Sequence, residues 1–381
     1  MAKSQSKQID KSDYEVSRPT PNKKIAAPRL AYRPQRPDKY RPGIGLIGCG
    51  GITASHLTVY RRARYRVVAL MDLDRARAES RRDEYYPRAC VLDTAEELLA
   101  RDDVEVVDIA THPSERVPLI EAAIAAGKHV LSQKPFVTDL SVGKRLVAAA
   151  KRKGVQLAVN QNGRWAPHVS YARQAVAAGL LGEITSVDTA IHFDHNWTAE
   201  TPFNKIRHLI LYDFAIHWFD MVHCYLREQK ATRVYAATQA TKTQQARPPL
   251  LAQALVEFPH AQASLIFRGD TQRGAQDRTV IVGTKGTLVS EGSNFNEQTI
   301  RIFTDQGIAT PKLTGRWFDD GFDGTMSELL LAIEQRREPS NSAADNLHSL
   351  ALCFAALASA ETKQPVKPGA AKRIEPAWLT I

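Results

Sequence analysis

The chain has 381 residues, a length that favours two domains, and its 43% hydrophobic and 24% charged residues are typical of a globular protein. Of its net charge of +10, residues 1–42 carry +7 (eleven Lys/Arg against four Asp/Glu), which leaves no basic face elsewhere for nucleic acid. Without a membrane-length apolar run, a secretory signal or a cysteine-based metal motif, the sequence predicts a cytoplasmic protein with no membrane, metal or nucleic-acid partner.

Residues 1–42 are expected to form a basic, proline-rich N-terminal arm, because they hold six of the twenty prolines and little apolar periodicity. Leu30, Tyr32 and Tyr40 lie among these prolines. Apolar and aromatic side chains gain little from a purely solvated tail, which favours an arm that lies across a neighbouring subunit. Solubility alone, or an electrostatic tether to polyanions, are the alternatives.

The segment Gly43–Ala54 combines a short apolar strand, a glycine turn and the start of a helix. This context is the one in which a G-x-G pattern indicates dinucleotide binding. Gly48 permits the tight turn, and Gly50 lets the backbone approach a pyrophosphate. Gly51 and Ile52 complete the turn at the helix N-terminus, whose free N–H groups suit an anion.

The next strand, 67–71, ends at Asp72, which lies 22 residues after Gly50. A carboxylate at this position can bond the ribose 2′-OH of NAD and would repel the 2′-phosphate of NADP. The third position of the fingerprint, usually Gly or Ala, is Thr53. The pattern therefore predicts NAD, in preference to NADP, as the cofactor.

Alternating strands and helices continue to about residue 164 and predict a doubly wound parallel sheet, a Rossmann domain over 43–164. Thr94 and Glu97 are spaced as a capping box for one of its helices. The predicted strands are 89–92, 104–110, 129–131 and 155–159, and the helices are 95–101, 119–126 and 141–153. Ligands bind such sheets at the carboxyl ends of the strands. With the glycine turn and Asp72, the cofactor crevice should hold Thr111, His112, Pro113, Gln133, Lys134 and Asn160.

From residue 165 to 381 the pattern changes to an α+β domain with a large, open, mostly antiparallel sheet. The expected strands are 184–193, 233–239, 251–258, 261–268, 279–283, 286–290 and 299–304. The expected helices are 171–178, 209–225, 325–334 and 343–361, the last two packing back on the body. A sheet face that no helix covers predicts a homo-oligomer, either a dimer or a tetramer.

Two stretches carry candidate chemistry. Lys134 follows a strand end and precedes Pro135, where its ammonium could stabilise a developing oxyanion; a plain surface lysine is the alternative. Asp213 and His217 are four residues apart in an apolar predicted helix, so they should share one face, one turn from each other. Such a histidine suits a general base, although a core histidine satisfied by a carboxylate would show the same pattern.

These segments together resemble the glucose–fructose oxidoreductase/inositol dehydrogenase/rhizopine catabolism family over roughly residues 43–368. The motifs that carry the resemblance are Gly43–Thr53, Asp72, Ala110-Thr-His-Pro113, Gly127–Pro135, Arg164 and Asp213-x-x-x-His217. The resemblance implies an N-terminal NAD(P)-binding Rossmann domain and an open-sheet domain for substrate and oligomer contacts. It also implies a catalytic triad of Lys134, Asp213 and His217, and a cis Lys134–Pro135 bond.

In that family the histidine takes a hydroxyl proton while hydride goes to nicotinamide C4, the lysine binds the reacting oxygen and the aspartate orients the site. The chain departs from the family pattern where Gln133 replaces a glutamate and Arg116 replaces a histidine. Polar and aromatic loops add candidate substrate contacts. With Asp213 and His217, these are Arg164, Trp165, His192, Asn196 and Trp197.

The resemblance implies an NAD-dependent dehydrogenase acting on a secondary hydroxyl of a sugar, glycoside or inositol. One alternative is NAD-assisted glycoside cleavage through transient oxidation and elimination. The other is a sugar or nucleotide sensor that has kept the fold and lost turnover, although a sensor has no need of Lys134, Asp213 and His217 together.

Overall fold

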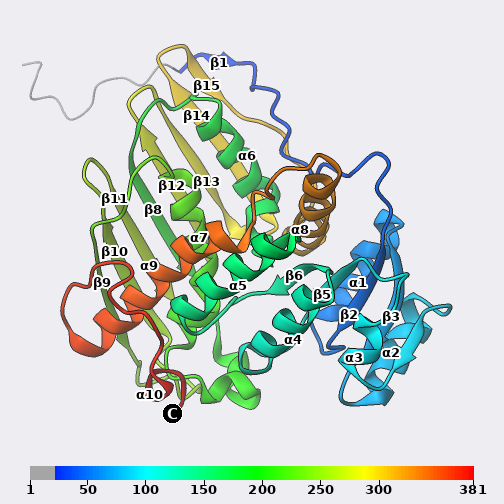
Figure 1. Cartoon of the computed structure of the whole chain (residues 1–381). Coiled ribbons are helices and arrows are strands. Elements are labelled where there is room, and N and C mark those ends of the chain that lie inside the picture. Colours follow the sequence, from blue (N-terminus) through cyan, green and yellow to red (C-terminus); the bar gives the residue numbers. More distant parts are fainter. Residues whose placement is uncertain (1–21) are drawn as a thin grey trace, which may run out of the picture.

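The computed structural model describes residues 22–381, and in it a six-stranded and a nine-stranded sheet lie side by side (Figure 1). The six-stranded sheet is parallel throughout, in the order β4-β3-β2-β5-β6-β7. Its strands are β2 (Gly43–Ile47), β3 (Arg66–Met71), β4 (Cys90–Leu92), β5 (Val106–Ile109), β6 (His129–Gln133) and β7 (Leu157–Asn160). The predicted doubly wound Rossmann sheet is confirmed.

Five helices make the crossovers of this sheet. They are α1 (Thr53–Ala63), α2 (Arg75–Tyr85), α3 (Ala95–Leu99), α4 (Pro113–Ala125) and α5 (Leu140–Lys153). The capping box of Thr94 and Glu97 is present at α3. The sequence pattern misses α2, because this charged helix buries only Ala78 and so shows no apolar stripe. It also starts α4 too late, since Pro113 at the first helical position begins that helix.

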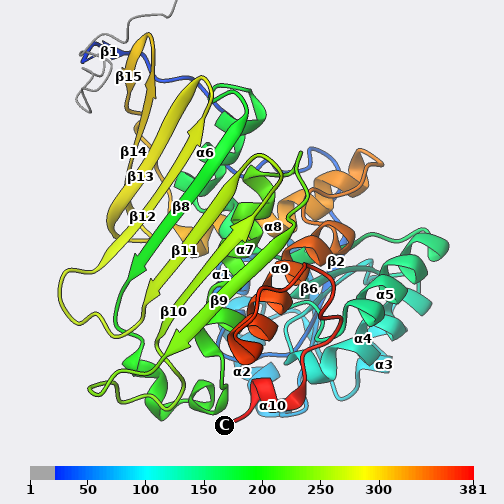
Figure 2. The ribbon, with the colours of Figure 1, turned by 90° about the vertical axis from the view of Figure 1, so that its left-hand side faces the viewer.

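The nine-stranded sheet has the order β1-β15-β14-β13-β12-β8-β11-β10-β9 and is antiparallel except for the pairs β8–β11 and β1–β15. Its strands are β1 (Lys24–Ile25), β8 (Ile184–His192), β9 (Arg233–Gln239), β10 (Leu251–Glu257), β11 (Gln262–Arg268), β12 (Gln276–Gly283), β13 (Gly286–Asn294), β14 (Glu297–Thr304) and β15 (Gly307–Ala309). Helices α6 (Pro167–Ala177), α7 (Ile216–Tyr225) and α9 (Ala343–Thr362) cover one face, and no described helix covers the other (Figure 2).

Helix α8 (Trp317–Glu334) comes from the second half of the chain but packs on the Rossmann sheet. Met326, Leu329 and Leu330 share a core with buried residues of β2, β6 and β7. The helix begins eight residues before the predicted start at Thr325. Two glycines hide its pattern, and both mark close packing: a Cβ on Gly321 would lie 2.7 Å from a backbone oxygen, and one on Gly324 would overlap an indole ring.

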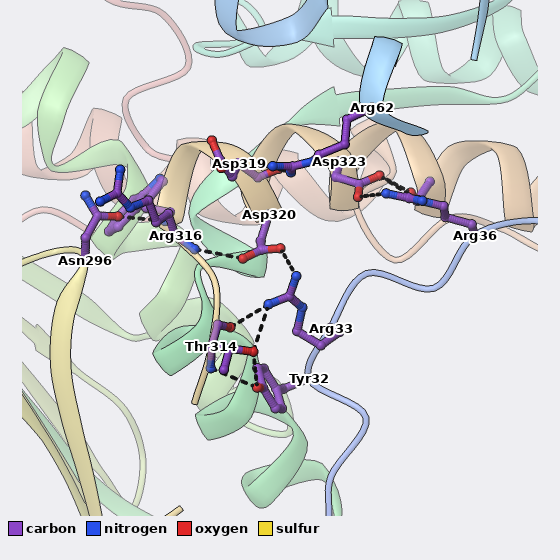
Figure 3. A network of polar contacts seen from close by, with 12 residues as sticks. Tyr32, Arg33, Arg36, Arg62, Asn296, Thr314, Arg316, Asp319, Asp320 and Asp323 are labelled. Atoms are coloured by element: carbon purple, nitrogen blue, oxygen red, sulfur yellow. Dashed lines mark hydrogen bonds and ion pairs between the residues drawn. The ribbon is translucent and has the colours of Figure 1, made fainter. Parts of the chain in front are cut away.

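The described part of the N-terminal arm lies along its own chain. Strand β1 pairs with β15 at the sheet edge, and the segment then follows α8 toward the Rossmann domain (Figures 1 and 3). The Glu334 carboxylate at the end of α8 accepts hydrogen bonds from the backbone N–H groups of Asp38, Lys39 and Tyr40 at 3.0, 2.7 and 2.6 Å. Leu30 and Tyr32 also pack against this body. Residues 1–21 lie outside the described residues.

Within residues 22–381, no helix is both long and apolar enough to cross a membrane.

Candidate active site

The glycine turn between β2 and α1 has an open surface. Gly48 has φ of +93°, and a Cβ there would lie 2.8 Å from the carbonyl oxygen of Ala110, so this position requires glycine. A Cβ on Gly50 or Gly51 would meet no atom within 4 Å. The buried Thr53 hydroxyl donates to the Gly50 carbonyl at 2.6 Å and so holds the turn from below. The turn thus fits a pyrophosphate at the N-terminus of α1.

Asp72 stands beside this turn at the end of β3. Its carboxylate accepts hydrogen bonds from the backbone N–H groups of Cys49 at 2.6 Å and Asp74 at 2.9 Å, which fix its orientation. The nearby Arg75 pairs with Glu79 at 2.9 Å and with Asp93, and both pairs engage its guanidinium within α2 and the turn before α3. An oriented carboxylate with the next arginine engaged elsewhere fits a ribose diol better than a 2′-phosphate.

The loop after β6 carries Lys134 and is fixed by the buried Arg116. The Arg116 guanidinium donates to the backbone carbonyls of Thr111, Gln133 and Pro135, and so ties the ends of β5 and β6 together. Burial lowers the pKa of Arg116 to about 10, which leaves it charged at neutral pH. Arg116, which stands where the family pattern has a histidine, therefore has a structural role here. The Lys134–Pro135 bond is cis, as the resemblance implies.

Lys134 crosses from the Rossmann domain to the second domain. Its Nζ donates to the backbone carbonyl of Asp213 at 2.8 Å and to the Asp213 carboxylate at 3.0 Å. Both side chains are only partly buried, at 17% and 27% exposure, so a ligand can reach the ammonium. Two of its three N–H donors are thus engaged, and one remains for a substrate oxygen.

The predicted continuous helix over 209–225 is wrong in its first turn. Residues Ile210–Phe214 form a π-helical turn, in which the Ala215 N–H bonds to the Ile210 carbonyl at 2.7 Å, and α7 starts at Ile216. Asp213 and His217 therefore do not sit one regular helical turn apart. Such π-helical turns are frequent at functional sites. Here the turn places both the carbonyl and the carboxylate of Asp213 on Lys134.

His217 lies at the start of α7 against Gly163 and the indole of Trp317. The imidazole meets the Trp317 ring edge-on, with centroids 5.6 Å apart, and a Cβ on Gly163 would lie 3.3 Å from Nδ1. Burial and, to a smaller extent, the positive charge of Lys134 together lower the pKa of His217 to about 3, although the negative charge of Asp220 acts in the opposite direction. Nδ1 is buried with no hydrogen-bond partner among the described residues, which leaves Nε2 for a ligand. His217 is thus a neutral imidazole at physiological pH.

A buried polar cluster lies beneath the strand ends. The Asp108 carboxylate accepts from the Tyr60 hydroxyl at 2.8 Å and pairs with His56 Nδ1 at 2.7 Å. His56 Nε2 lies 3.2 Å from Gln133 Nε2 and 3.3 Å from Asn160 Nδ2. The Gln133 side-chain oxygen Oε1 accepts from the Lys134 backbone N–H at 2.7 Å, so the cluster supports the loop that carries Lys134.

Sequence reasoning missed His56, Asp108 and Tyr60. They lie on α1 and β5 at positions where nothing in the local pattern separates them from ordinary helix and strand residues. Trp317 was missed because the glycines of α8 obscured its helix. The topology alone brings these residues to the crevice.

Several predicted substrate residues have other roles. Arg164 is fully buried and pairs with Asp220 at 2.6 Å and with Asp345 at 2.7 Å, so its guanidinium is not a substrate contact. Trp165 is buried against α8, with the Arg173 guanidinium 5.5 Å from its ring centroid. The two residues belong to a 3-10 helical turn, Asn162–Trp165, that packs against α7 and α8, and in this structure both side chains are buried.

The loop after β8 holds the remaining candidates. Asn196 is buried, and its side-chain oxygen Oδ1 accepts from the Gln245 backbone N–H at 2.6 Å, so it shapes the loop. His192 is the last residue of β8 and pairs with β11 and β12. Trp197 is 59% exposed and remains free to meet a ligand. The ring of His195 connects this loop to Phe214 in the π-helical turn, with centroids 4.3 Å apart.

Among the described residues, no three His, Cys, Asp or Glu side chains are grouped to hold a metal ion. The site consists of the open glycine turn, the oriented Asp72 carboxylate, the Lys134 ammonium and the neutral His217 imidazole, at the carboxyl edge of the parallel sheet. Thr111, His112 and Pro113 follow β5 at the same edge and start α4.

Two family descriptions match the chain. Residues 43–161 match the oxidoreductase family with an NAD-binding Rossmann fold, and residues 169–289 match the GFO/IDH/MocA C-terminal domain. Inositol 2-dehydrogenase of Rhizobium meliloti is 27% identical over 333 residues, which cover 84% of this chain and 98% of that protein. D-apiose dehydrogenase of Paraburkholderia graminis is 26% identical over 336 residues, covering 84% and 88%.

A solved oxidoreductase from Agrobacterium radiobacter, in complex with NAD+, L-tartaric acid and magnesium, shares the fold. Its TM-score is 0.78 at 22% sequence identity, and the match covers 87% of this chain and 99% of that one. Since the two family matches span both domains, the chain belongs to the Gfo/Idh/MocA oxidoreductase family and has its NAD-binding Rossmann domain.

Proposed function

We propose that the protein is an NAD-dependent dehydrogenase that oxidises a secondary hydroxyl of a sugar, glycoside or inositol. The observation that carries this proposal is the Lys134 ammonium, which Asp213 holds with two hydrogen bonds at the cofactor edge of the sheet. A lysine without a role would keep its ammonium in water, because desolvating it is costly. The adjacent neutral His217 supplies the second group that the reaction needs.

The roles of the side chains follow from their hydrogen bonds. Lys134 donates its third N–H to the reacting oxygen and stabilises the negative charge that develops there. His217 Nε2 accepts the hydroxyl proton, which its lowered pKa permits because the ring is neutral when substrate binds. The glycine turn and Asp72 would hold NAD, which would supply the hydride acceptor beside these groups. Asp213 keeps the ammonium aimed and charged through its carboxylate and its carbonyl.

The substrate class is supported by the site and by the relatives. A polyol needs donors and acceptors for its hydroxyls and a ring for its C–H face, and the exposed indole of Trp197 provides such a ring. Relatives that match both domains are named for inositol and for apiose, both of which are polyhydroxy compounds. The Asn196 side chain holds this loop through its hydrogen bond from the Gln245 N–H.

The decisive experiment follows nicotinamide absorbance while the protein and NAD are offered a panel of sugars, glycosides and inositols, with product analysis in parallel. We expect NADH formation with at least one class of substrate. Lys134→Ala should lower kcat by about 100-fold or more, since one oxyanion donor contributes about that factor. Arg62→Ala serves as control, because this residue lies in an exposed ion pair with Asp319.

Other outcomes separate the alternatives. Cleavage of a glycoside without net NADH would replace the dehydrogenase by redox-assisted elimination. Tight NAD binding with neither reaction, across the whole panel, would indicate a sensor.

The pH dependence tests the role of His217. A base must be neutral to accept a proton, and the pKa of His217 is lowered from 6.5 to about 3. Activity should therefore be retained as pH falls through 6.5 and should be lost only as pH approaches the lowered value. We expect kcat/KM to stay level from about pH 8 to about pH 5. A fall centred near 6.5 that disappears in His217→Asn would contradict the neutral imidazole.

Cofactor choice tests Asp72. Without its carboxylate, the ribose loses an acceptor and the 2′-phosphate loses a repelling charge. We therefore expect Asp72→Ser to weaken NAD binding about tenfold and to strengthen NADP binding relative to NAD, as measured by titration calorimetry. Asp83→Ser on the exposed side of α2 is the matched control. Tighter binding of NADP than NAD by the unaltered protein would refute the assignment of NAD.

We also propose a homo-oligomer in which a second copy covers the free face of the nine-stranded sheet (Figure 2). Tyr235 and Leu255 are large apolar side chains exposed on this sheet, at facing positions of β9 and β10. Light scattering after size-exclusion chromatography should show a dimer or tetramer. Leu255→Lys should shift the protein toward monomer, whereas a monomeric unaltered protein at micromolar concentration would contradict the proposal.

A further inference from the structure

The N-terminal segment fastens the first turn of α8 through one guanidinium (Figure 3). Arg33 pairs with the Asp320 carboxylate at 2.9 Å and donates to the backbone carbonyl of Thr314 at 2.6 Å. Thr314 precedes the helix and Asp320 lies in its first turn. Arg33 thus joins the entry to the helix and the helix itself, although it lies far away in the sequence.

The same turn is closed from the other side. The second oxygen of Asp320 accepts from the Arg316 N–H at 2.9 Å, and the Tyr32 hydroxyl accepts from the Thr314 N–H at 3.0 Å (Figure 3). Gly315 has φ of +113°, and a Cβ there would overlap the Asp320 carboxylate and crowd Arg33. The chain is therefore built to bring the arginine and the carboxylate together over this turn.

Trp317, which follows this turn and begins α8, reaches the active site. The Trp317 backbone N–H donates to Asn296 Oδ1 at 2.9 Å, and its indole Nε1–H donates to Asn162 Oδ1 at 3.0 Å. The ring is buried and meets His217 edge-on at 5.6 Å. One wall of the candidate base is thus the first residue of the helix that Arg33 fastens.

We propose that Arg33 is a positioning residue of the active site: by tying Thr314 to Asp320, it fixes the turn that presents Trp317 to His217. The described part of the arm is then a component of the catalytic scaffold. The expected effect on catalysis rests on the proposed function. The expected effect on the surroundings of His217 does not, because it can be measured in the protein without substrate.

The Arg33–Asp320 pair differs from the neighbouring Arg62–Asp319 pair in the solvent exposure of its carboxylate. The Asp320 side chain is 2% exposed, so removal of the Arg33 guanidinium leaves a buried carboxylate without its cation. The turn must then open to water or Asp320 must take up a proton. Arg62 and Asp319 are each 47% exposed and pair at 2.9 Å, so their loss changes little.

Opening of the turn would change the protonation of His217. The ionisable groups on the surrounding elements include Lys134 after β6, Asp213 in the π-helical turn, Asp220 on α7, His168 on α6, Arg164, which pairs with Asp220, and Asp320 and Asp323 within α8. None of these belongs to the turn before α8. When Trp317 is displaced, more of the partly exposed imidazole meets water, the cost of charging it falls, and its pKa rises toward 6.5.

The experiment measures the pKa of His217 by NMR in full-length protein labelled at histidine, with the signal assigned by comparison with His217→Asn. We expect Arg33→Ala to raise this pKa by about one unit or more, and Arg33→Lys to restore part of the difference. Arg62→Ala should leave it unchanged. Where a substrate is known, Arg33→Ala should lower kcat by about tenfold and change KM less.

An unchanged His217 pKa in Arg33→Ala, accompanied only by a lower melting temperature, would overturn the proposal and leave Arg33 as a purely structural contact. If Arg33→Ala does not fold, Trp317→Phe replaces it: this variant keeps a ring but loses the hydrogen bond to Asn162, and an unchanged pKa there would also overturn the proposal. Because the NMR readout needs no substrate, it decides the question even where the proposed dehydrogenase activity fails.

Discussion

The contact between Lys134 and Asp213 is the interaction on which the site depends, because it joins the two domains at their functional edge. The lysine comes from the loop directly after β6, and the aspartate comes from a π-helical turn of the second domain. Neither domain alone holds the ammonium. The pair is partly buried and fixes the direction of the ammonium, so its importance for the site lies in orientation.

The surroundings of this contact consist of groups that restrict motion. Arg116 ties three backbone carbonyls of the strand ends, and the cluster of His56, Asp108 and Tyr60 supports Gln133 from beneath. These charged and polar groups are buried, so each needs its hydrogen-bond partner to compensate for the hydration that it lost on folding. This requirement restricts the motion of the cluster and lets the loop of Lys134 keep one geometry.

Helix α8 contacts both domains. It covers the Rossmann sheet with Leu329 and Leu330 while its first residue, Trp317, lies against His217 of the second domain. The N-terminal arm follows the same helix from Asp320 to Glu334. Helix α8 thus belongs to the second half of the chain but packs on the Rossmann domain. It connects the cofactor side of the site with the proposed substrate side.

The sequence by itself determined what depends on short-range pattern. Glycine spacing, apolar strands and Asp72 indicated the Rossmann domain, and the motifs around Lys134 and His217 indicated the family, because each is readable within about ten residues. The tertiary structure alone decided what depends on distant contacts. The burial of Arg164 with Asp220 and Asp345, the contact of Asp213 with Lys134, and the path of the arm along α8 all involve partners far apart in the chain. Local pattern carries no information about such partners, since only folding brings them within hydrogen-bond distance.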